Sequence, residues 1–250
     1  MSQRAAEVLR NADTIVGYTT YIELIRPLIR DKTVVSTGMT QEVKRVDAAI
    51  ETALSGRSCA IVSSGDPGIY AMAGLVFEMC TAKQIRVAAP PGTVERDASQ
   101  PRLTVEVIPG IPALCAGAAL LGAPLTHDFA AISLSDLLTP WERIEARLEA
   151  AAKADFVIVI YNPKSRRRSE NLEKAQRILL QHRDGRTPVG VVSRAMRPGQ
   201  KVRVTSLAEI HHAEVDMQTT LFVGSSRSQQ YLDFMVTPRG YGRKYDLKDE

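Results

Sequence analysis

The chain is poor in aromatic residues and in cysteine, and each shortage excludes a class of protein. Only 5% of its 250 residues are Phe, Trp or Tyr, too few for a surface on which nucleic-acid bases stack. Cys59, Cys80 and Cys115 form no CxxC pair and are odd in number, so neither a disulfide framework nor a zinc site is indicated. Their apolar neighbours predict buried structural thiols.

Long apolar runs and several common motifs are absent as well. No stretch approaches the ~18 apolar residues of a membrane span, and residues 1–13 contain no apolar signal core. We therefore expect a soluble, cytoplasmic protein. There is no GxGxxG, GxxxxGK[ST], GxSxG or HExxH motif, so a dinucleotide-binding fold, a P-loop NTPase, an α/β-hydrolase and a zincin lose their main support. The histidines are scattered, and no metal site is predicted.

What the sequence does contain is a globular composition with a mild basic excess. Hydrophobic residues make up 44% of the chain, enough for a substantial core. Lys and Arg number 32 against 28 Asp and Glu, a net charge of +4. This excess is too weak to indicate nucleic acid, and it suits an acidic small-molecule ligand.

In the first half of the chain, continuous apolar runs alternate with helical patterns. This alternation predicts a buried, mostly parallel sheet. The expected strands are 14–16, 33–36, 59–63 and 104–108. The expected helices are 4–12, 18–29, 41–54, 69–81 and 113–121.

After residues 122–128 the pattern starts again, and here the late strands follow each other closely. Close spacing predicts antiparallel pairing and a mixed sheet. The expected strands are 130–134, 156–160, 189–193, 201–205 and 219–223, with helices over 141–152 and 169–182. We therefore predict an α/β protein of two α/β domains with a cleft between them: residues 1–125 with a mostly parallel sheet, 126–238 with a mixed sheet, and a charged tail over 239–250.

Three turns follow predicted strands, where open α/β sheets bind their ligands. They are residues 63–70 (SSGDPGIY), 109–112 (PGIP) and 161–165 (YNPKS). In the first turn, Gly65 allows close approach of a ligand to the backbone, and Asp66 can accept hydrogen bonds. The alternative is a plain turn in which Asp66 caps the next helix.

Two charged segments carry further alternatives. The run from Lys164 to Arg168 stands where a helix is expected to begin, and it is either a solvated face or part of an anion site. Cations at the start of a helix are unfavourable because they oppose the helix dipole, and a bound anion would offset that cost. The pair His127–Asp128 is either a linker or part of a catalytic group.

Together the motifs resemble the tetrapyrrole methyltransferases that use S-adenosylmethionine. The resemblance covers the chain to about Ser226, and within that superfamily it is most similar to the precorrin-3B C17-methyltransferases of cobalamin biosynthesis. Members that act on ribosomal RNA share a Ser-Asp-Ala-Gly turn instead, which is absent here. The segments that carry the resemblance are residues 16–22 (VGYTTYI), 64–70 (SGDPGIY), 107–113 (VIPGIPA), 134–141 (LSDLLTPW), 160–163 (IYNP) and 219–224 (TTLFVG).

The resemblance implies a cofactor, S-adenosylmethionine, held in the cleft and released as S-adenosylhomocysteine, and it implies a homodimer. The implied reaction is methylation of precorrin-3B at C17 with ring contraction to precorrin-4. Family members usually open with a strand and a Gly-x-Gly-Pro-Gly loop that faces the tetrapyrrole; Ser2–Ala5 matches only the helix start that follows, and that strand and loop are missing here. The implied cofactor contacts are Gly65, Asp66, Ile69, Tyr70, Ala113, Tyr161, Asn162, Ala195 and Thr220.

The roles in catalysis and substrate binding are hypotheses from the residues. Asp66, His127 and Asp136 are the titratable candidates for the proton transfers of ring contraction. Arg166, Arg167 and Arg168 are candidates for binding the many carboxylates of the macrocycle. The alternatives are another enzyme of the same pathway, such as the C11-methyltransferase, and a basic protein that binds or modifies RNA. Whether the substrate carries cobalt is left open.

Overall fold

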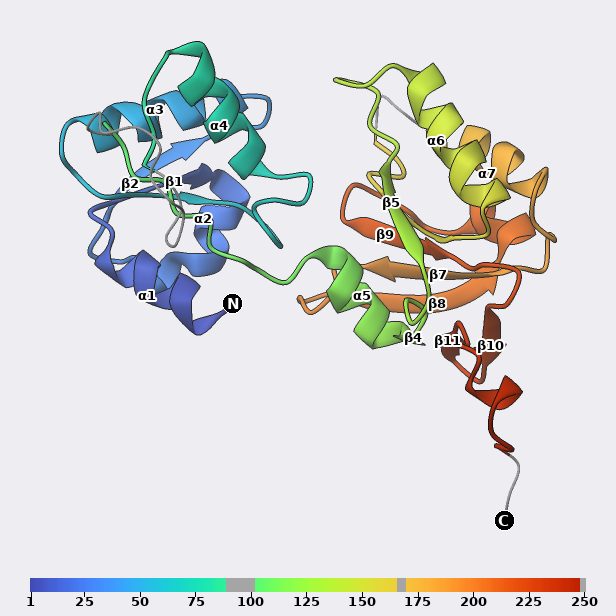
Figure 1. Ribbon diagram of the computed structural model, residues 1–250. Helices are drawn as coiled ribbons and strands as arrows, with labels where there is room; N and C mark the ends of the chain where they lie inside the picture. The colour runs from blue at the N-terminus through green and yellow to red at the C-terminus, as the bar shows by residue number, and fades with distance from the viewer. Residues whose placement is uncertain (89–101, 166–169, 248–250) are drawn as a thin grey trace. The chain divides into compact units, whose positions relative to one another are not determined.

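The structure, a computed structural model, describes residues 1–88, 102–165 and 170–247 (Figure 1). The chain forms two compact units, Met1–Pro112 and Ala113–Glu250. This division falls earlier than the expected boundary near residue 125, because the helix α5 (Ala113–Leu121) contacts β7, β8 and β9 of the second unit.

The first unit contains a three-stranded parallel sheet of order β2-β1-β3. β1 is central, and its Val16 lies opposite Val35 on one side and Ile61 on the other. The predicted parallel arrangement is confirmed. The strands are β1 (Thr14–Tyr18), β2 (Thr33–Thr37) and β3 (Cys59–Val62).

Helices cover both faces of this sheet. Ile22 of α2 packs with Ile15 on one face, whereas Val46 of α3 packs with Ile61 on the other. Successive strand residues point to opposite faces, so the central strand β1 is buried from both sides, while β3 is half-buried and β2 is partly exposed. The helices are α1 (Gln3–Asn11), α2 (Thr19–Ile25), η1 (Arg26–Leu28), α3 (Glu42–Leu54) and α4 (Met72–Ala82).

The second unit is built on a five-stranded mixed sheet of order β5-β6-β9-β7-β8. β5 and β6 are parallel, and every other neighbouring pair is antiparallel, as the short spacing of the late strands predicted. The strands are β5 (Phe129–Ser133), β6 (Val157–Tyr161), β7 (Pro188–Ser193), β8 (Lys201–Ser206) and β9 (Thr219–Val223).

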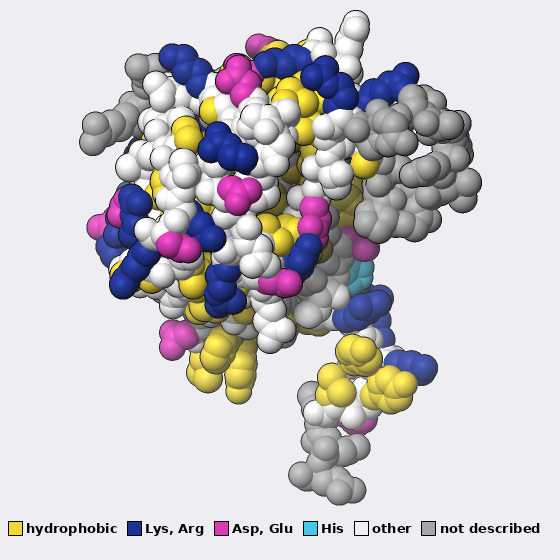
Figure 2. All heavy atoms as spheres, turned by 90° about the vertical axis from the view of Figure 1, so that its left-hand side faces the viewer, with side chains coloured by type: hydrophobic (Ala, Val, Ile, Leu, Met, Phe, Trp, Pro, Cys, Tyr) yellow, Lys and Arg dark blue, Asp and Glu magenta, His cyan; other side chains and the backbone are white. Residues whose placement is uncertain are grey.

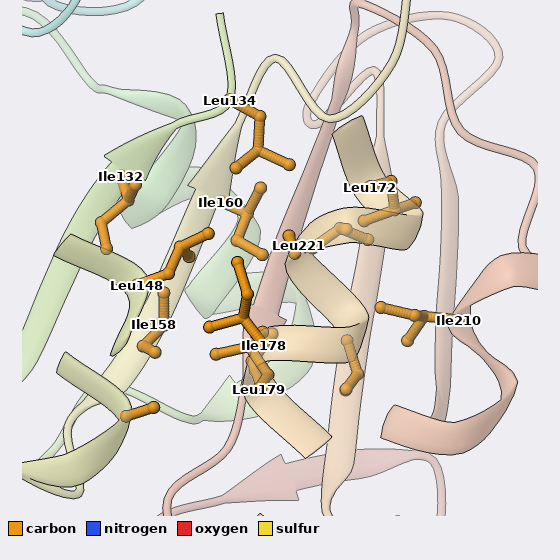
Figure 3. Close-up of a cluster of buried hydrophobic side chains, with 14 of the residues drawn as sticks. Ile132, Leu134, Leu148, Ile158, Ile160, Leu172, Ile178, Leu179, Ile210 and Leu221 are labelled. Carbon is orange, nitrogen blue, oxygen red and sulfur yellow. The ribbon is translucent and has the colours of Figure 1, made fainter. Parts of the chain in front are cut away.

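The main core of this unit lies between its sheet and the helices α6 (Trp141–Lys153), α7 (Asn171–Leu180) and η2 (Leu207–His212). Figure 3 shows Leu148 and Leu179 of these helices beside Ile158 of β6. α5 packs closely on β7 and β9, and glycines make room for it. A Cβ added at Gly117 would lie 2.6 Å from the Phe222 ring.

A small three-stranded sheet follows, with order β10-β11-β4, and the sequence did not predict it. Its strands are short and mostly exposed, so they lack the apolar runs by which buried strands are recognised. The elements are β4 (Gly122–Ala123), β10 (Gln229–Tyr231), β11 (Phe234–Val236) and the turn η3 (Tyr241–Arg243).

Three local predictions are wrong. Residues 104–108 form no strand: the preceding Leu103 makes only an isolated bridge with Val87, outside the sheet, and Glu106 pairs with Arg4 of α1. α4 begins at Met72 rather than at residue 69, because the preceding turn continues through Tyr70. Cys115 is exposed, since its neighbours Leu114 and Ala116 occupy the buried side of α5.

None of the helices in the described part of the chain is both long and apolar enough to cross a bilayer.

Candidate functional site

The turn after β3 is the first part of the candidate site. Gly65 is exposed and has φ +72°, a left-handed conformation that glycine adopts without steric cost. The Ile69 amide donates to the Asp66 carbonyl at 3.2 Å, and the Ala73 amide donates to the Pro67 carbonyl at 2.9 Å. These bonds fix the turn onto the start of α4 and leave its glycine backbone open to a ligand.

The Asp66 carboxylate connects this turn to the next one. Its Oδ1 accepts the Gly68 amide at 2.8 Å, and its Oδ2 accepts the Gly110 amide at 2.9 Å. A Cβ at Gly110 would lie 2.0 Å from the Gly65 carbonyl oxygen, so the two backbones are in contact. Asp66 therefore joins the two turns; it does not cap α4, whose N-cap is Ala71 with no side-chain bond.

Unusual backbone conformations concentrate at the expected cofactor contacts. Eight of the described non-glycine residues have positive φ, and four of these lie at or beside those contacts: Tyr70, Asn162, Arg194 and Met196. Such conformations cost free energy and are common at ligand sites, where the surrounding structure enforces them. Arg194 and Met196 flank Ala195, which places that residue in a tightly constrained turn.

One edge of the five-stranded sheet gathers the expected contacts of the second unit. Because β9 is antiparallel to β6 and β7, its first residues lie beside the last residues of those strands. Thr220 is opposite Val192 near the end of β7, and Tyr161 is opposite Ser133 at the end of β5. Tyr161, Asn162, Ala195 and Thr220 thus share this edge, which we call the carboxyl edge.

Side-chain hydrogen bonds tie α5 and two loops to the carboxyl edge. The Leu114 amide donates to the Tyr161 hydroxyl oxygen at 2.9 Å, which sets Ala113 at the start of α5 beside Tyr161. The Asn162 Nδ2 donates to Ser133 Oγ at 2.9 Å, and the Ser135 amide donates to the same oxygen at 3.2 Å. Sequence reasoning missed Ser133; its only signal was a hydroxyl at a strand end.

The remaining candidates lie in different places. Val157 donates its amide to the Asp128 carbonyl at 3.1 Å, so His127 lies at the amino ends of β5 and β6, away from the carboxyl edge. His127 Nδ1 accepts the Asp128 amide at 2.8 Å. Asp136 is exposed in the loop after β5, which leaves from the carboxyl edge. Arg166, Arg167 and Arg168 lie outside the described residues.

The turn after β3 offers groups that suit the cofactor that the resemblance implies. An exposed glycine backbone at Gly65 and an exposed ring at Tyr70 suit a flat, polar nucleoside, which binds through backbone groups and ring contacts. In the second unit, Thr220 is buried and the Tyr161 hydroxyl accepts the Leu114 amide. On the face drawn in Figure 2, Lys and Arg side chains are interspersed with Asp and Glu.

Comparison with known proteins gives a consistent family. Residues 1–211 match the tetrapyrrole (corrin/porphyrin) methylases. The chain is 48% identical over 247 residues to the cobalt-factor III methyltransferase of Priestia megaterium, covering 99% of this chain and 44% of that protein. It is 44% identical over 241 residues to the probable cobalt-factor III C(17)-methyltransferase of Salmonella typhimurium, covering 96% and 93%. The chain thus spans less than half of the first relative and nearly all of the second.

Solved structures of methyltransferases have a similar fold. The crystal structure of the methyltransferase CobJ has a TM-score of 0.81 and 33% identity, covering 95% of this chain and 93% of that one. Uroporphyrin-III C-methyltransferase from Thermus thermophilus, complexed with S-adenosyl homocysteine, has a TM-score of 0.64 over 90% of each chain. At 19% identity, that second likeness concerns the fold alone.

Proposed function

This chain belongs to the tetrapyrrole methylase family, as its motifs predicted, and from that premise we propose that it methylates C17 of a precorrin-3B-type macrocycle in cobalamin biosynthesis. The proposed product is the ring-contracted precorrin-4 type, with S-adenosylmethionine as the methyl donor. The observation that carries the proposal is the 44% identity to a probable C(17)-methyltransferase along 96% of this chain and 93% of that protein.

The cofactor contacts are proposed for both units. Gly65, Ile69 and Tyr70 offer backbone groups and an exposed ring, and Asp66 keeps their turn in place through its bonds to Gly68 and Gly110. At the carboxyl edge the proposed contacts are Ala113, Tyr161, Asn162, Ala195 and Thr220. When bound, the sulfonium provides an electrophilic methyl group.

Methyl transfer from a sulfonium disperses charge, so the protein's task is to orient the reactants and exclude water. We propose that Asp136 handles a proton during ring contraction, since it stands exposed in the loop after β5. Asp66 is less suited, because both of its carboxylate oxygens already accept backbone amides. Beside Asp136, Leu137 and Leu138 are 74% and 98% exposed, and we propose that they contact the apolar face of the macrocycle.

The substrate-binding role of Arg166, Arg167 and Arg168 stays a proposal from their charge. The homodimer is a proposal from the family resemblance, and light scattering of the purified protein would test it. The names of the two curated relatives point to a cobalt-bearing substrate and the sequence resemblance to a metal-free one, so both forms belong in the assay.

Calorimetric titration with S-adenosylhomocysteine tests the cofactor half of the proposal. We expect binding with a dissociation constant in the micromolar range or below. A second titration, with a polycarboxylate tetrapyrrole such as uroporphyrin III, tests the substrate half. Binding of neither ligand would contradict the proposed function, and tight binding of RNA at physiological salt would favour the alternative class.

A further inference from the structure

The second unit has an open surface hollow of about 430 Å³ that the proposed cofactor contacts do not account for. It lies where β7 ends and β8 begins, so it adjoins the carboxyl edge. Three segments line it: the loop after β6 with Lys164, the β7–β8 turn with Arg194 and Lys201, and the approach to β9 with Glu214 and Asp216. We call it the β7–β8 hollow.

The charges of the β7–β8 hollow do not cancel. Lys201 is paired with Glu214 at 2.7 Å. Asp216 keeps its negative charge, although its Oδ1 accepts the Gln218 amide at 2.8 Å and the Thr219 hydroxyl at 2.9 Å. The lining therefore carries Lys164, Arg194 and Lys201 against Glu214 and Asp216, one positive charge in excess. Within the described part of the chain, neither Lys164 nor Arg194 has a carboxylate within ion-pair distance.

The backbone of Arg194 is fixed, whereas its side chain is exposed. Its backbone has φ +52°, and its amide donates to the Gln218 carbonyl at 3.0 Å. Its carbonyl accepts the Arg197 amide at 3.0 Å. The guanidinium lies against Gly199, where a Cβ would be 3.0 Å from Nη1. The constrained backbone and this contact direct the guanidinium toward the hollow that it lines.

We propose that Lys164 and Arg194 bind a peripheral carboxylate of the tetrapyrrole substrate in the β7–β8 hollow. The planar guanidinium can donate two parallel hydrogen bonds to a carboxylate, and the ammonium adds a second positive charge. A hollow of about 430 Å³ is larger than one carboxylate requires, which suits a side arm of a large ligand. This inference rests on the proposed function, because that function supplies the polycarboxylate ligand.

The test compares Lys164→Gln, Arg194→Gln and the double variant with the unmodified protein. Uroporphyrin III is the probe, a stable tetrapyrrole with carboxylate side arms, and its binding is followed by fluorescence. Each single change should weaken uroporphyrin affinity about 3- to 10-fold, and the double change should weaken it further. Affinity for S-adenosylhomocysteine should stay within about twofold. Arg203→Gln is the matched control, because it removes an exposed cation from β8 outside the hollow.

The outcomes separate this inference from the proposed function. Unchanged uroporphyrin affinity in the double variant, with S-adenosylhomocysteine still bound, overturns the inference and leaves the function standing. If the double variant loses S-adenosylhomocysteine affinity and keeps its uroporphyrin affinity, the hollow belongs to the cofactor site, and the inference is again overturned. If the unmodified protein binds neither ligand, the proposed function fails first. If Arg203→Gln weakens uroporphyrin affinity equally, the effect comes from the protein's net charge, and the proposal of a specific site in the hollow is overturned.

Discussion

Asp66 shows how much one side chain contributes to the candidate site without any chemistry of its own. Its two carboxylate oxygens accept amides from Gly68 and Gly110, residues of two separate turns. An asparagine offers only one acceptor oxygen, and its NH₂ group would face the other amide. Asp66→Asn should therefore lower the free energy of unfolding by about 1–2 kcal/mol and weaken S-adenosylhomocysteine binding in calorimetry. Asp31→Asn, on an exposed carboxylate, is the control and should change neither.

Gly110 and Gly74 are glycines with opposite expected responses to alanine. At Gly110 the new Cβ would lie 2.0 Å from the Gly65 carbonyl oxygen, so the turns must separate. At Gly74, inside α4, nothing lies within 4 Å and the backbone is helical. Gly110→Ala should abolish measurable S-adenosylhomocysteine binding, whereas Gly74→Ala should raise the free energy of unfolding by up to about 1 kcal/mol. A Gly110→Ala protein with normal affinity would contradict the contact between the turns.

Cys59 and Cys115 should differ sharply in reactivity. Burial raises the pKa of the Cys59 thiol from 9.0 to about 11. At pH 8 a thiol reagent should modify exposed Cys115 first, and Cys115→Ser should remove that fast phase. The unfolded chain ionises Cys59 at lower pH than the folded one does, so this residue's contribution to stability should fall as pH rises from about 9 to 11. Equal rates for both thiols would contradict the assigned burial.

At this scale the motifs point to candidate residues but do not reveal the contacts between them. Gly65, Asp66 and Tyr70 were proposed as site residues because a Gly-Asp-Pro-Gly turn after an apolar strand is a strong local pattern. The bond from Asp66 to Gly110 joins residues far apart in the chain, and no local pattern encodes it. Cys115 was misjudged for the same reason: an apolar helix does not reveal which of its sides meets the sheet.

At the scale of elements, the connection from α6 to β6 depends on Asp155. Its carboxylate pairs with Arg183, whose side chain is only 2% exposed, and accepts the amide and hydroxyl of Ser226 at 2.8 and 2.6 Å. Asp155→Asn keeps the shape and tolerates φ +61°, but it leaves a buried guanidinium without its counter-charge. We expect a loss of about 1–3 kcal/mol in the free energy of unfolding, measured in urea.

The control for this change is Asp184→Asn, which removes a carboxylate paired with the well-exposed Arg186. It should have little effect, since exposed ion pairs contribute little. If both variants lose equal stability, the burial of Arg183 does not matter and the argument from Asp155 is wrong.

Elements were predictable where burial imposes a continuous apolar pattern. β6, β7 and β9 lie inside the sheet, and each was placed to within a residue or so of its observed bounds. Residues 104–108 look like a strand because Val105, Val107 and Ile108 are apolar, yet no strand pairs with them among the described residues. β10 and β11 are short and exposed, so their formation depends on pairing with each other and with β4.

At the scale of the whole molecule, the chain is two α/β units, and its sequence matches the tetrapyrrole methylase family over residues 1–211. The order of the motifs along the chain indicated that family more strongly than composition did, since a net charge of +4 excludes little. The units divide at Pro112, where the only sequence signal was a weak Pro-Gly-Ile-Pro turn. The boundary was expected near residue 125 because α5 was assigned to the first unit by its position in the chain, and its packing on the second sheet could not be read from the sequence.

The position of the transferred methyl group tests the central claim most directly. The protein is incubated with S-adenosylmethionine labelled with ¹³C in the methyl group and with precorrin-3B or cobalt-factor III, and the product is examined by NMR and mass spectrometry. We predict one labelled methyl group on C17 of a contracted ring with at least one of the two substrates. A label on any other carbon, such as C11, or no incorporation with either substrate by a protein that binds S-adenosylhomocysteine, would contradict the account.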